Sequence, residues 1–106
     1  METLNFRFER GTVALARPAQ LVGVVGSGNL EVLIEAAALA GACTIEIKTA
    51  ARGFGATWEA VMTDFHARWP LRDASISIND MGATPAVVSL RLDQAVESIN
   101  GSGARP

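Results

Sequence analysis

The chain has 106 residues, of which 49% are hydrophobic, and carries a net charge of −2 at pH 7. This length corresponds to one domain that buries roughly two thirds of its unfolded surface, so it can fold without disulfides or metals. The weak negative charge and the lack of a basic cluster exclude electrostatic binding to nucleic acid or to an anionic membrane. Cys43 is the only cysteine, no signal pattern opens the chain, and no apolar run approaches about 18 residues. We therefore expect a cytoplasmic protein with one buried thiol.

Six segments show the period-two alternation or the β-rich composition of strands. In chain order they are METLNFRF (1–8), LVGVVGS (21–27), LEVLIEA (30–36), CTIEIKT (43–49), SISIND (75–80) and VVSLRL (87–92). Residues 10–19, with a glycine and a proline, are predicted to be a connection. Alanines between 36 and 40 favour helix, so the pattern leaves residues 30–40 open between strand and helix.

One amphipathic helix is clearly predicted. Its apolar stripe has the spacing i, i+3, i+4, i+7 and i+11 and consists of Trp58, Val61, Met62, Phe65 and Trp69. Thr57 is placed to cap the helix and Pro70 to end it. We assign both tryptophans of this stripe to the core.

These elements predict an α+β fold, with a mainly antiparallel sheet and one or two helices packed on one face. A short helix is expected to start at Asp93, after the last predicted strand. GATP at 82–85 is interpreted as a turn that joins two strands. We expect a single small domain over residues 1–100 and a flexible tail over 101–106.

Ser27 stands out because Gly26 and Gly28 leave its hydroxyl without bulky neighbours. One interpretation is dinucleotide binding, in which VVGSGN would be a glycine turn before a helix over 30–42, with Glu46 on a ribose. Against it, Glu31 occupies the position of the third glycine, and the remaining chain does not alternate between strands and helices.

A second interpretation makes Ser27 a catalytic nucleophile. The G-x-S-x-G elbow is missing, since Val25 and Asn29 stand at the glycine positions. A serine also needs a base, and the only histidine, His66, is better explained as a half-buried residue at the flank of the helix. One histidine and one cysteine cannot form a metal site, so we expect no catalytic residue and no metal.

A third interpretation makes Gly28–Asn29 the two-residue turn of a hairpin, because both residues tolerate positive φ. Ser27 would then sit at the shoulder of an exposed turn. Periodicity alone favours a plain turn, with no function for the serine.

The segments VGVVGSGNLEVL (22–33) and INDMGATPAVVSLRLDQAVE (78–97) resemble the acyl carrier (delta) subunits of malonate decarboxylase, over nearly the whole chain. Citrate lyase acyl carriers are more distant relatives of the same functional class. The resemblance implies a non-catalytic carrier in which Ser27, between Gly26 and Gly28, bears a covalent prosthetic group. That group is 2′-(5″-phosphoribosyl)-3′-dephospho-coenzyme A, attached through a phosphodiester, and its thiol carries acetyl and malonyl.

The resemblance also implies three kinds of partner: an acetyl-S-carrier:malonate transferase subunit, decarboxylase subunits, and the transferase that attaches the prosthetic group. Further expectations concern single residues: Arg52 could contact a phosphate of the group, Asn29 and Glu31 could meet a partner, and the 82–85 loop could flank Ser27. Two alternatives stay open. One is a citrate lyase-type carrier, and the other is a structural or regulatory subunit with unmodified Ser27.

Overall fold

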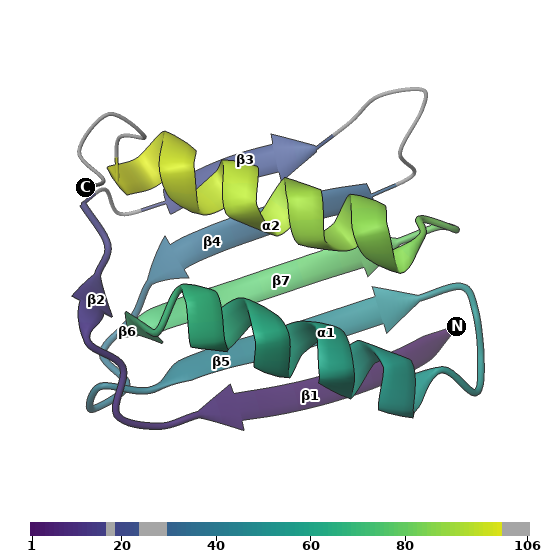
Figure 1. Cartoon of the computed structure of the whole chain (residues 1–106), viewed down its shortest axis with the longest axis horizontal. Coiled ribbons are helices and arrows are strands. Elements are labelled where there is room, and N and C mark those ends of the chain that lie inside the picture. The colour runs from purple at the N-terminus through teal and green to yellow at the C-terminus, as the bar shows by residue number, and fades with distance from the viewer. Residues whose placement is uncertain (17–18, 24–29, 101–106) are drawn as a thin grey trace.

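A computed structural model describes residues 1–16, 19–23 and 30–100. Five strands form one sheet in the order β1-β5-β7-β4-β3, and two helices accompany it (Figure 1). The sheet strands are β1 (Glu2–Phe8), β3 (Ala19–Gly23), β4 (Leu30–Ala36), β5 (Cys43–Thr49) and β7 (Ala74–Asp80). The helices are α1 (Gly55–Arg68) and α2 (Pro85–Asn100), and a separate two-residue ladder joins β2 (Val13–Ala14) to β6 (Leu71–Arg72).

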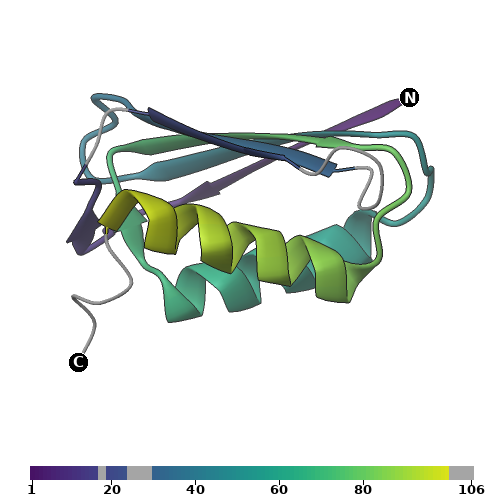
Figure 2. The ribbon, with the colours of Figure 1, turned by 90° about the horizontal axis from the view of Figure 1, so that it is seen from above.

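Three of the four ladders in the sheet are antiparallel: β1 with β5, β3 with β4, and β4 with β7. The fourth, between β5 and β7, is parallel because α1 crosses over between these two strands. Both helices lie on the same face of the sheet (Figure 2). The expected α+β fold, with a mainly antiparallel sheet and helices on one face, is confirmed.

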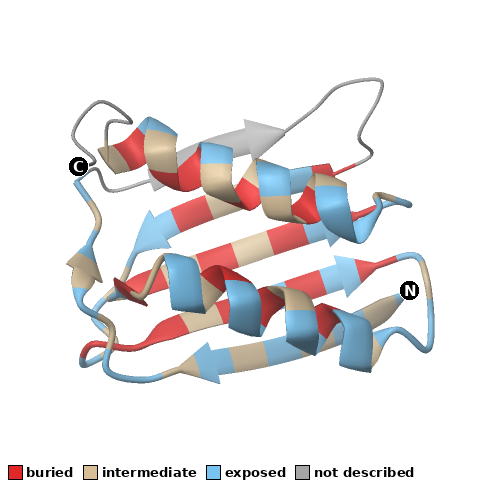
Figure 3. Cartoon of the chain, viewed as in Figure 1, coloured by how far each residue is buried: buried red, intermediate tan, exposed pale blue. Residues whose placement is uncertain are grey.

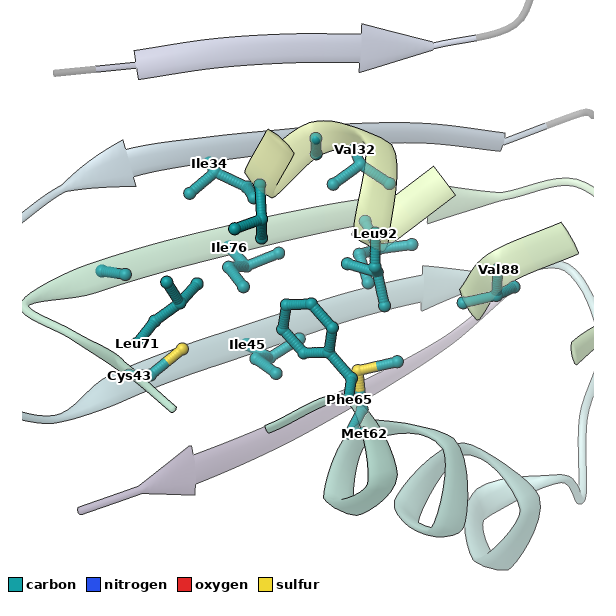
Figure 4. Close-up of a cluster of buried hydrophobic side chains, with 14 of the residues drawn as sticks. Val32, Ile34, Cys43, Ile45, Met62, Phe65, Leu71, Ile76, Val88 and Leu92 are labelled. Carbon is teal, nitrogen blue, oxygen red and sulfur yellow. The ribbon is translucent and has the colours of Figure 1, made fainter. Parts of the chain in front are cut away.

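The core is one apolar layer between the sheet and the helices (Figures 3 and 4). Alternate residues of the central strands point into it: in β5, Ile45 and Ile47 are buried, whereas Glu46 and Lys48 are exposed. Phe65 and Met62 of α1 fill its centre, and Val88 and Leu92 of α2 cover the neighbouring strands. Cys43 is fully buried here, and burial raises the pKa of its thiol to about 12.

The predicted strands at the N-terminus, at 43–49 and at 75–80 are all present, and so is the helix that ends before Pro70. Thr57 is not its cap, however. The helix begins at Gly55, with Phe54 at the N-cap position and no side-chain hydrogen bond to the first turn. Of the two tryptophans, Trp58 is buried, whereas Trp69 is half-buried at the end of the helix and donates its indole N–H to Asp93 (3.1 Å).

The predicted strand VVSLRL and the helix start at Asp93 are wrong, because both belong to α2. Its buried residues follow helical spacing: Val88, Leu92, Ala95, Val96 and Ile99. The alternation of the predicted strand covers only a few residues, whereas this stripe extends over three turns and buries a continuous face against the sheet. The predicted connection at 10–19 likewise contains β2 and the start of β3.

Gly11 provides a first test, because a Cβ at this position would lie 1.9 Å from the carbonyl oxygen of Leu71. We expect Gly11→Ala to lower the free energy of unfolding by about 1–3 kcal/mol through this clash, as measured by urea denaturation. Gly55→Ala is the matched control, since its Cβ would meet only Leu4 Cδ2 at 3.9 Å. In a helix, alanine at position 55 should be neutral or stabilising by up to about 1 kcal/mol. Equal losses in the two variants would contradict the close approach at Gly11.

Candidate functional site

Strand ends, strand starts and both helix starts meet at one end of the sheet. β5 and β7 terminate there at Thr49 and Asp80, which are partners in the ladder. Leu30, the first residue of β4, lies directly opposite Asp80. Because each helix follows one of the strands that terminate here, α1 and α2 both begin at the same end (Figure 1). We call this the Asp80 end of the sheet.

Ser27, Gly26 and Gly28 lie outside the described residues, in the segment 24–29 that links β3 to β4 at the Asp80 end. The flanking strands form the antiparallel pair expected of a hairpin, with Gly23 opposite Glu31. Ser27 is thus equally far along the chain from the two partners that close the described ladder. A two-residue turn at Gly28–Asn29 would instead pair Ser27 with Leu30. That pairing is shifted by three positions from the register in which Gly23 pairs with Glu31. Gly28 and Asn29 also lie outside the described residues.

The dinucleotide-binding interpretation is wrong, because residues 30–36 form β4 and not a helix. β4 pairs antiparallel with both β3 and β7, so the residues after the glycines are not the helix of a strand–turn–helix unit. Glu46, the candidate ribose ligand, points away from the helices on the exposed face of β5.

His66 is not a partner for a catalytic serine either. Its ring stacks on Phe8 with 4.7 Å between centroids, and its Nε2 lies 3.3 Å from the carbonyl oxygen of Leu71. Phe8 pairs with Cys43, at the end of the sheet opposite Asp80. The half-buried helix-flank position expected for this histidine is confirmed.

Asp80 is the residue that organises its end of the sheet, although it is only 3% exposed. One carboxylate oxygen accepts hydrogen bonds from the backbone N–H groups of Gly82 (3.2 Å) and Ala83 (2.7 Å). The other accepts the hydroxyl of Thr49 (2.8 Å), whose oxygen in turn accepts the N–H of Ala51 (3.1 Å). One carboxylate therefore fixes the loops that lead into both helices.

The sequence around Asp80 also contains a pattern that predicts this role. An aspartate at the end of a strand, with a glycine two residues later and a proline five residues later, is typical of a side chain that bonds back to the turn before a helix. The loop at 82–85 accordingly joins a strand to a helix, and not two strands as predicted. Pro85 is the first residue of α2, Thr84 accepts the N–H of Val87 (3.3 Å), and Gly82 adopts a positive φ of 121°.

A small cavity of about 90 Å³ opens at the Asp80 end, between the first turns of the two helices. Its lining is mostly apolar and includes Phe54, Trp58, Ala83 and Val88, with Asp80 as the ionisable member. Phe54 is 52% exposed although it is a large apolar residue. Met1 and Met81, also exposed, flank the same end of the sheet.

Charged groups of both signs lie at the Asp80 end. Neither helix has an acidic residue in its first turn, and the first turn of α1 has no side-chain cap. The positive ends of both helix dipoles therefore face the Asp80 end. The carboxylates at this end accept backbone N–H groups just before the helices, Glu2 that of Gly53 (3.3 Å) and Asp80 those of Gly82 and Ala83. Arg52 is exposed in the loop between β5 and α1, at the same end. Glu31 is exposed on the sheet face opposite the helices.

The described residues contain no group of three or more metal-ligating side chains that could hold an ion. Over the same residues, neither helix combines the length and hydropathy of a membrane-spanning segment.

Comparison with known proteins gives consistent results. Residues 17–99 match the family described as "Malonate decarboxylase delta subunit (MdcD)". The malonate decarboxylase acyl carrier protein of Stenotrophomonas maltophilia (strain R551-3) is 64% identical over 97% of this chain and 98% of its own. The protein of that name from Xanthomonas euvesicatoria pv. vesicatoria is 65% identical over 98% of this chain and 100% of its own.

A solved structure shares the fold at substantial sequence identity. It is a chain of a Pseudomonas malonate decarboxylase hetero-tetramer crystallised in complex with malonate. That chain is 40% identical and superposes with a TM-score of 0.79, over 94% of this chain and 100% of its own. The chain described here therefore belongs to the malonate decarboxylase delta subunit family.

Proposed function

We propose that the chain is the acyl carrier subunit of a malonate decarboxylase and that Ser27 is the attachment site of its prosthetic group. The group is 2′-(5″-phosphoribosyl)-3′-dephospho-coenzyme A, joined to the serine through a phosphodiester. The observation that carries the proposal is the family match over residues 17–99, which includes Ser27 between its two glycines. Relatives that match nearly end to end bear the name acyl carrier protein.

The described residues fit such a group at the Asp80 end. The group carries several phosphates, and this end presents two helix N-termini without first-turn acids, together with Arg52. We include Arg52 in the proposal as a contact for a phosphate, since an exposed guanidinium can donate two parallel hydrogen bonds to two oxygens of one phosphate. The apolar cavity beside these charges supplies a surface for the non-polar parts of the group.

When attached, the group supplies a thiol that holds acetyl or malonyl as a thioester. The chain's own part is to anchor and present this arm. The Ser27 oxygen forms the covalent link, while β3 and β4 hold both sides of the segment through their ladder. A tether of this kind keeps its cargo at about millimolar effective concentration near each partner's active site, so that transfer becomes effectively intramolecular.

The partners that this role requires are a transferase subunit that exchanges acetyl for malonyl, decarboxylase subunits, and the enzyme that attaches the arm. Each must release the carrier after its reaction, which favours small, polar-rimmed contacts. Asn29 and Glu31 flank Ser27 in sequence, and we propose them as part of the surface these partners meet. We likewise propose that residues 1–100 suffice as the carrier domain.

Removal of the serine hydroxyl is the most direct test. In protein purified from its native host grown on malonate, intact mass and peptide fragmentation should find the adduct on Ser27. Ser27→Ala should abolish the adduct and acyl loading while changing the free energy of unfolding by less than about 0.5 kcal/mol, since a connection hydroxyl contributes little to folding. Ser98→Ala, an exposed serine on α2, should keep the adduct.

Two results would contradict this prediction, and a third would change the assigned system. An unmodified Ser27 in the wild-type protein under these conditions would favour a structural or regulatory subunit. A large loss of stability in Ser27→Ala would instead identify a structural serine. Copurifying citrate lyase subunits in place of decarboxylase subunits would reassign the carrier to the citrate system.

Because Cys43 is buried, a thiol reagent can count the thiol of the attached group in the folded protein. Cys43 is fully buried, and burial raises the pKa of its thiol to about 12, so at pH 8 the sulfur is both inaccessible to a reagent and protonated. The folded, bare chain should therefore react with no equivalent of a thiol reagent, and the deacylated, modified chain with one. In denaturant the counts should rise to one and two. Rapid reaction of Cys43 in the folded, bare chain would contradict the prediction.

Asp80 should matter for attachment as well as for stability. Asp80→Ala leaves two backbone N–H groups and the Thr49 hydroxyl without their acceptor, so we expect a loss of about 1–3 kcal/mol in the free energy of unfolding. It should also slow enzymatic modification of Ser27, because the loops at that end lose their support. Initial modification rates, followed by mass, measure this effect at a temperature where both variants are folded.

Asp73→Gly is the matched control for Asp80→Ala. Asp73 also accepts two backbone N–H bonds, from Leu39 and Gly41 (3.0 Å each), but lies at the opposite end of the sheet. Its φ of 53° makes glycine an unstrained replacement. This variant should lose stability without slower modification, and equal slowing in both variants would refute a local role for Asp80.

A further inference from the structure

The cavity at the Asp80 end has the chemistry of a site for a flat aromatic ring. Phe54 stands at its mouth, 52% exposed, and Trp58 forms part of its wall with only 7% of its surface accessible. Val88 of α2 and Ala83, in the loop before α2, complete the apolar lining, and Thr57 and Asp80 are its polar groups. Pockets that bind small molecules combine apolar and aromatic walls with a few polar groups in this way. At about 90 Å³ this cavity is much smaller than a pocket for a whole ligand, so a single flat ring at its opening is the largest group it suits.

The position of the cavity favours an occupant that is attached to Ser27. Asp80, which lines it, is the direct ladder partner of Leu30 on the next strand, and neighbouring strands are about 4.8 Å apart. Ser27 precedes Leu30 by three residues, a stretch that spans at most about 10 Å. A group attached to Ser27 is therefore tethered within reach of the cavity mouth and needs little free energy of its own to occupy it.

We propose that this cavity docks the adenine ring of the Ser27-linked group, with the ring stacked on Phe54 beside Trp58. The proposal rests on the function proposed above. Within that group the adenosine lies next to the phosphoribosyl link, close to the serine, whereas the thiol stands at the far end of the pantetheine. Docking of the base would anchor the near part of the arm and leave the acyl-bearing part free to reach the partner subunits.

The chemistry of the cavity also distinguishes adenine from the other parts of the arm. A malonyl thioester carries a carboxylate, which an apolar lining beside the buried Asp80 carboxylate would exclude. The phosphates belong outside, near Arg52 and the helix starts. Base–aromatic stacking needs no specific hydrogen-bond pattern, so the exposed face of Phe54 is sufficient to favour the docked form.

The two tryptophans allow a direct measurement, because the chain has only these two indole N–H groups. In ¹H–¹⁵N spectra of the bare and the modified protein, the Trp58 indole signal should move through the ring current of the adenine. The Trp69 signal should stay, since its N–H is bound to Asp93 at the far end of α1. Nuclear Overhauser contacts should connect the adenine protons H2 and H8 to the rings of Phe54 and Trp58.

Three variants of the modified protein sharpen the experiment. Phe54→Ala should lower the equilibrium constant for docking about tenfold, the usual effect of losing one base–aromatic stack, and return the Trp58 signal toward its bare position. Phe54→Tyr should keep the docked form, because tyrosine retains the stacking face. Leu90→Ala is the control for loss of an exposed apolar side chain, since Leu90 is 51% exposed but lies outside the cavity lining.

The outcomes are separable. An adduct on Ser27 with an unchanged Trp58 signal, or with contacts from pantetheine protons in place of adenine protons, would overturn the docking and leave the carrier function intact. Equal loss of docking in Phe54→Ala and Leu90→Ala would also overturn it. Absence of any adduct from the native protein would overturn the carrier function and the docking together.

Discussion

The parallel pairing of β5 with β7 determines the layout of the whole domain. Two parallel neighbours require a crossover, and α1 supplies it by running back across the sheet. β7 must then run in the same direction as β5 and end at its side, so the chain enters α2 from the same end. Both helices thus begin together, and the apolar layer beneath them is closed by residues from each.

This layout concentrates polar function at one end and leaves the other to packing. At the Asp80 end a single buried carboxylate holds the loops before both helices. At the opposite end, Phe8, His66 and the fully buried Cys43 close the core. A carrier has few other requirements: its body must be rigid enough to present one attachment point and must otherwise stay out of the chemistry.

The sequence predicted those parts of the fold whose patterns are long or unambiguous. The alternation in CTIEIKT coincides with β5, and the stripe from Trp58 to Phe65 lies within α1, because each pattern matches only one period. The prediction of a strand at VVSLRL failed because its three alternating apolar residues fit a strand. The helical stripe that starts at Val88 becomes visible only when residues up to Ile99 are included. The alternation of a few residues was therefore a weaker indicator of structure than the helical spacing of buried residues over a longer segment.

The candidate site was less accessible to physical reasoning than the fold. Flanking glycines marked Ser27 as open, but openness alone did not distinguish a carrier from a plain turn; only family resemblance connected the serine to a prosthetic group. The turn after Asp80 has a local sequence pattern, but the bond from Thr49 to Asp80 joins residues 31 apart in the sequence, so the link between the two loops could not be predicted. The exposure of Phe54 likewise follows from the meeting of two helix starts, which no single segment encodes.

The burial of Cys43 has a consequence for the fidelity of a carrier. Thioesters pass their acyl group readily to any thiolate they meet, and a reactive cysteine on the carrier body would compete with the partner enzymes for the cargo. Here the only cysteine is sealed beneath the sheet at the end opposite Asp80 and is almost wholly protonated at neutral pH. The fold thereby prevents transfer of the acyl group from the thioester to the carrier's own cysteine.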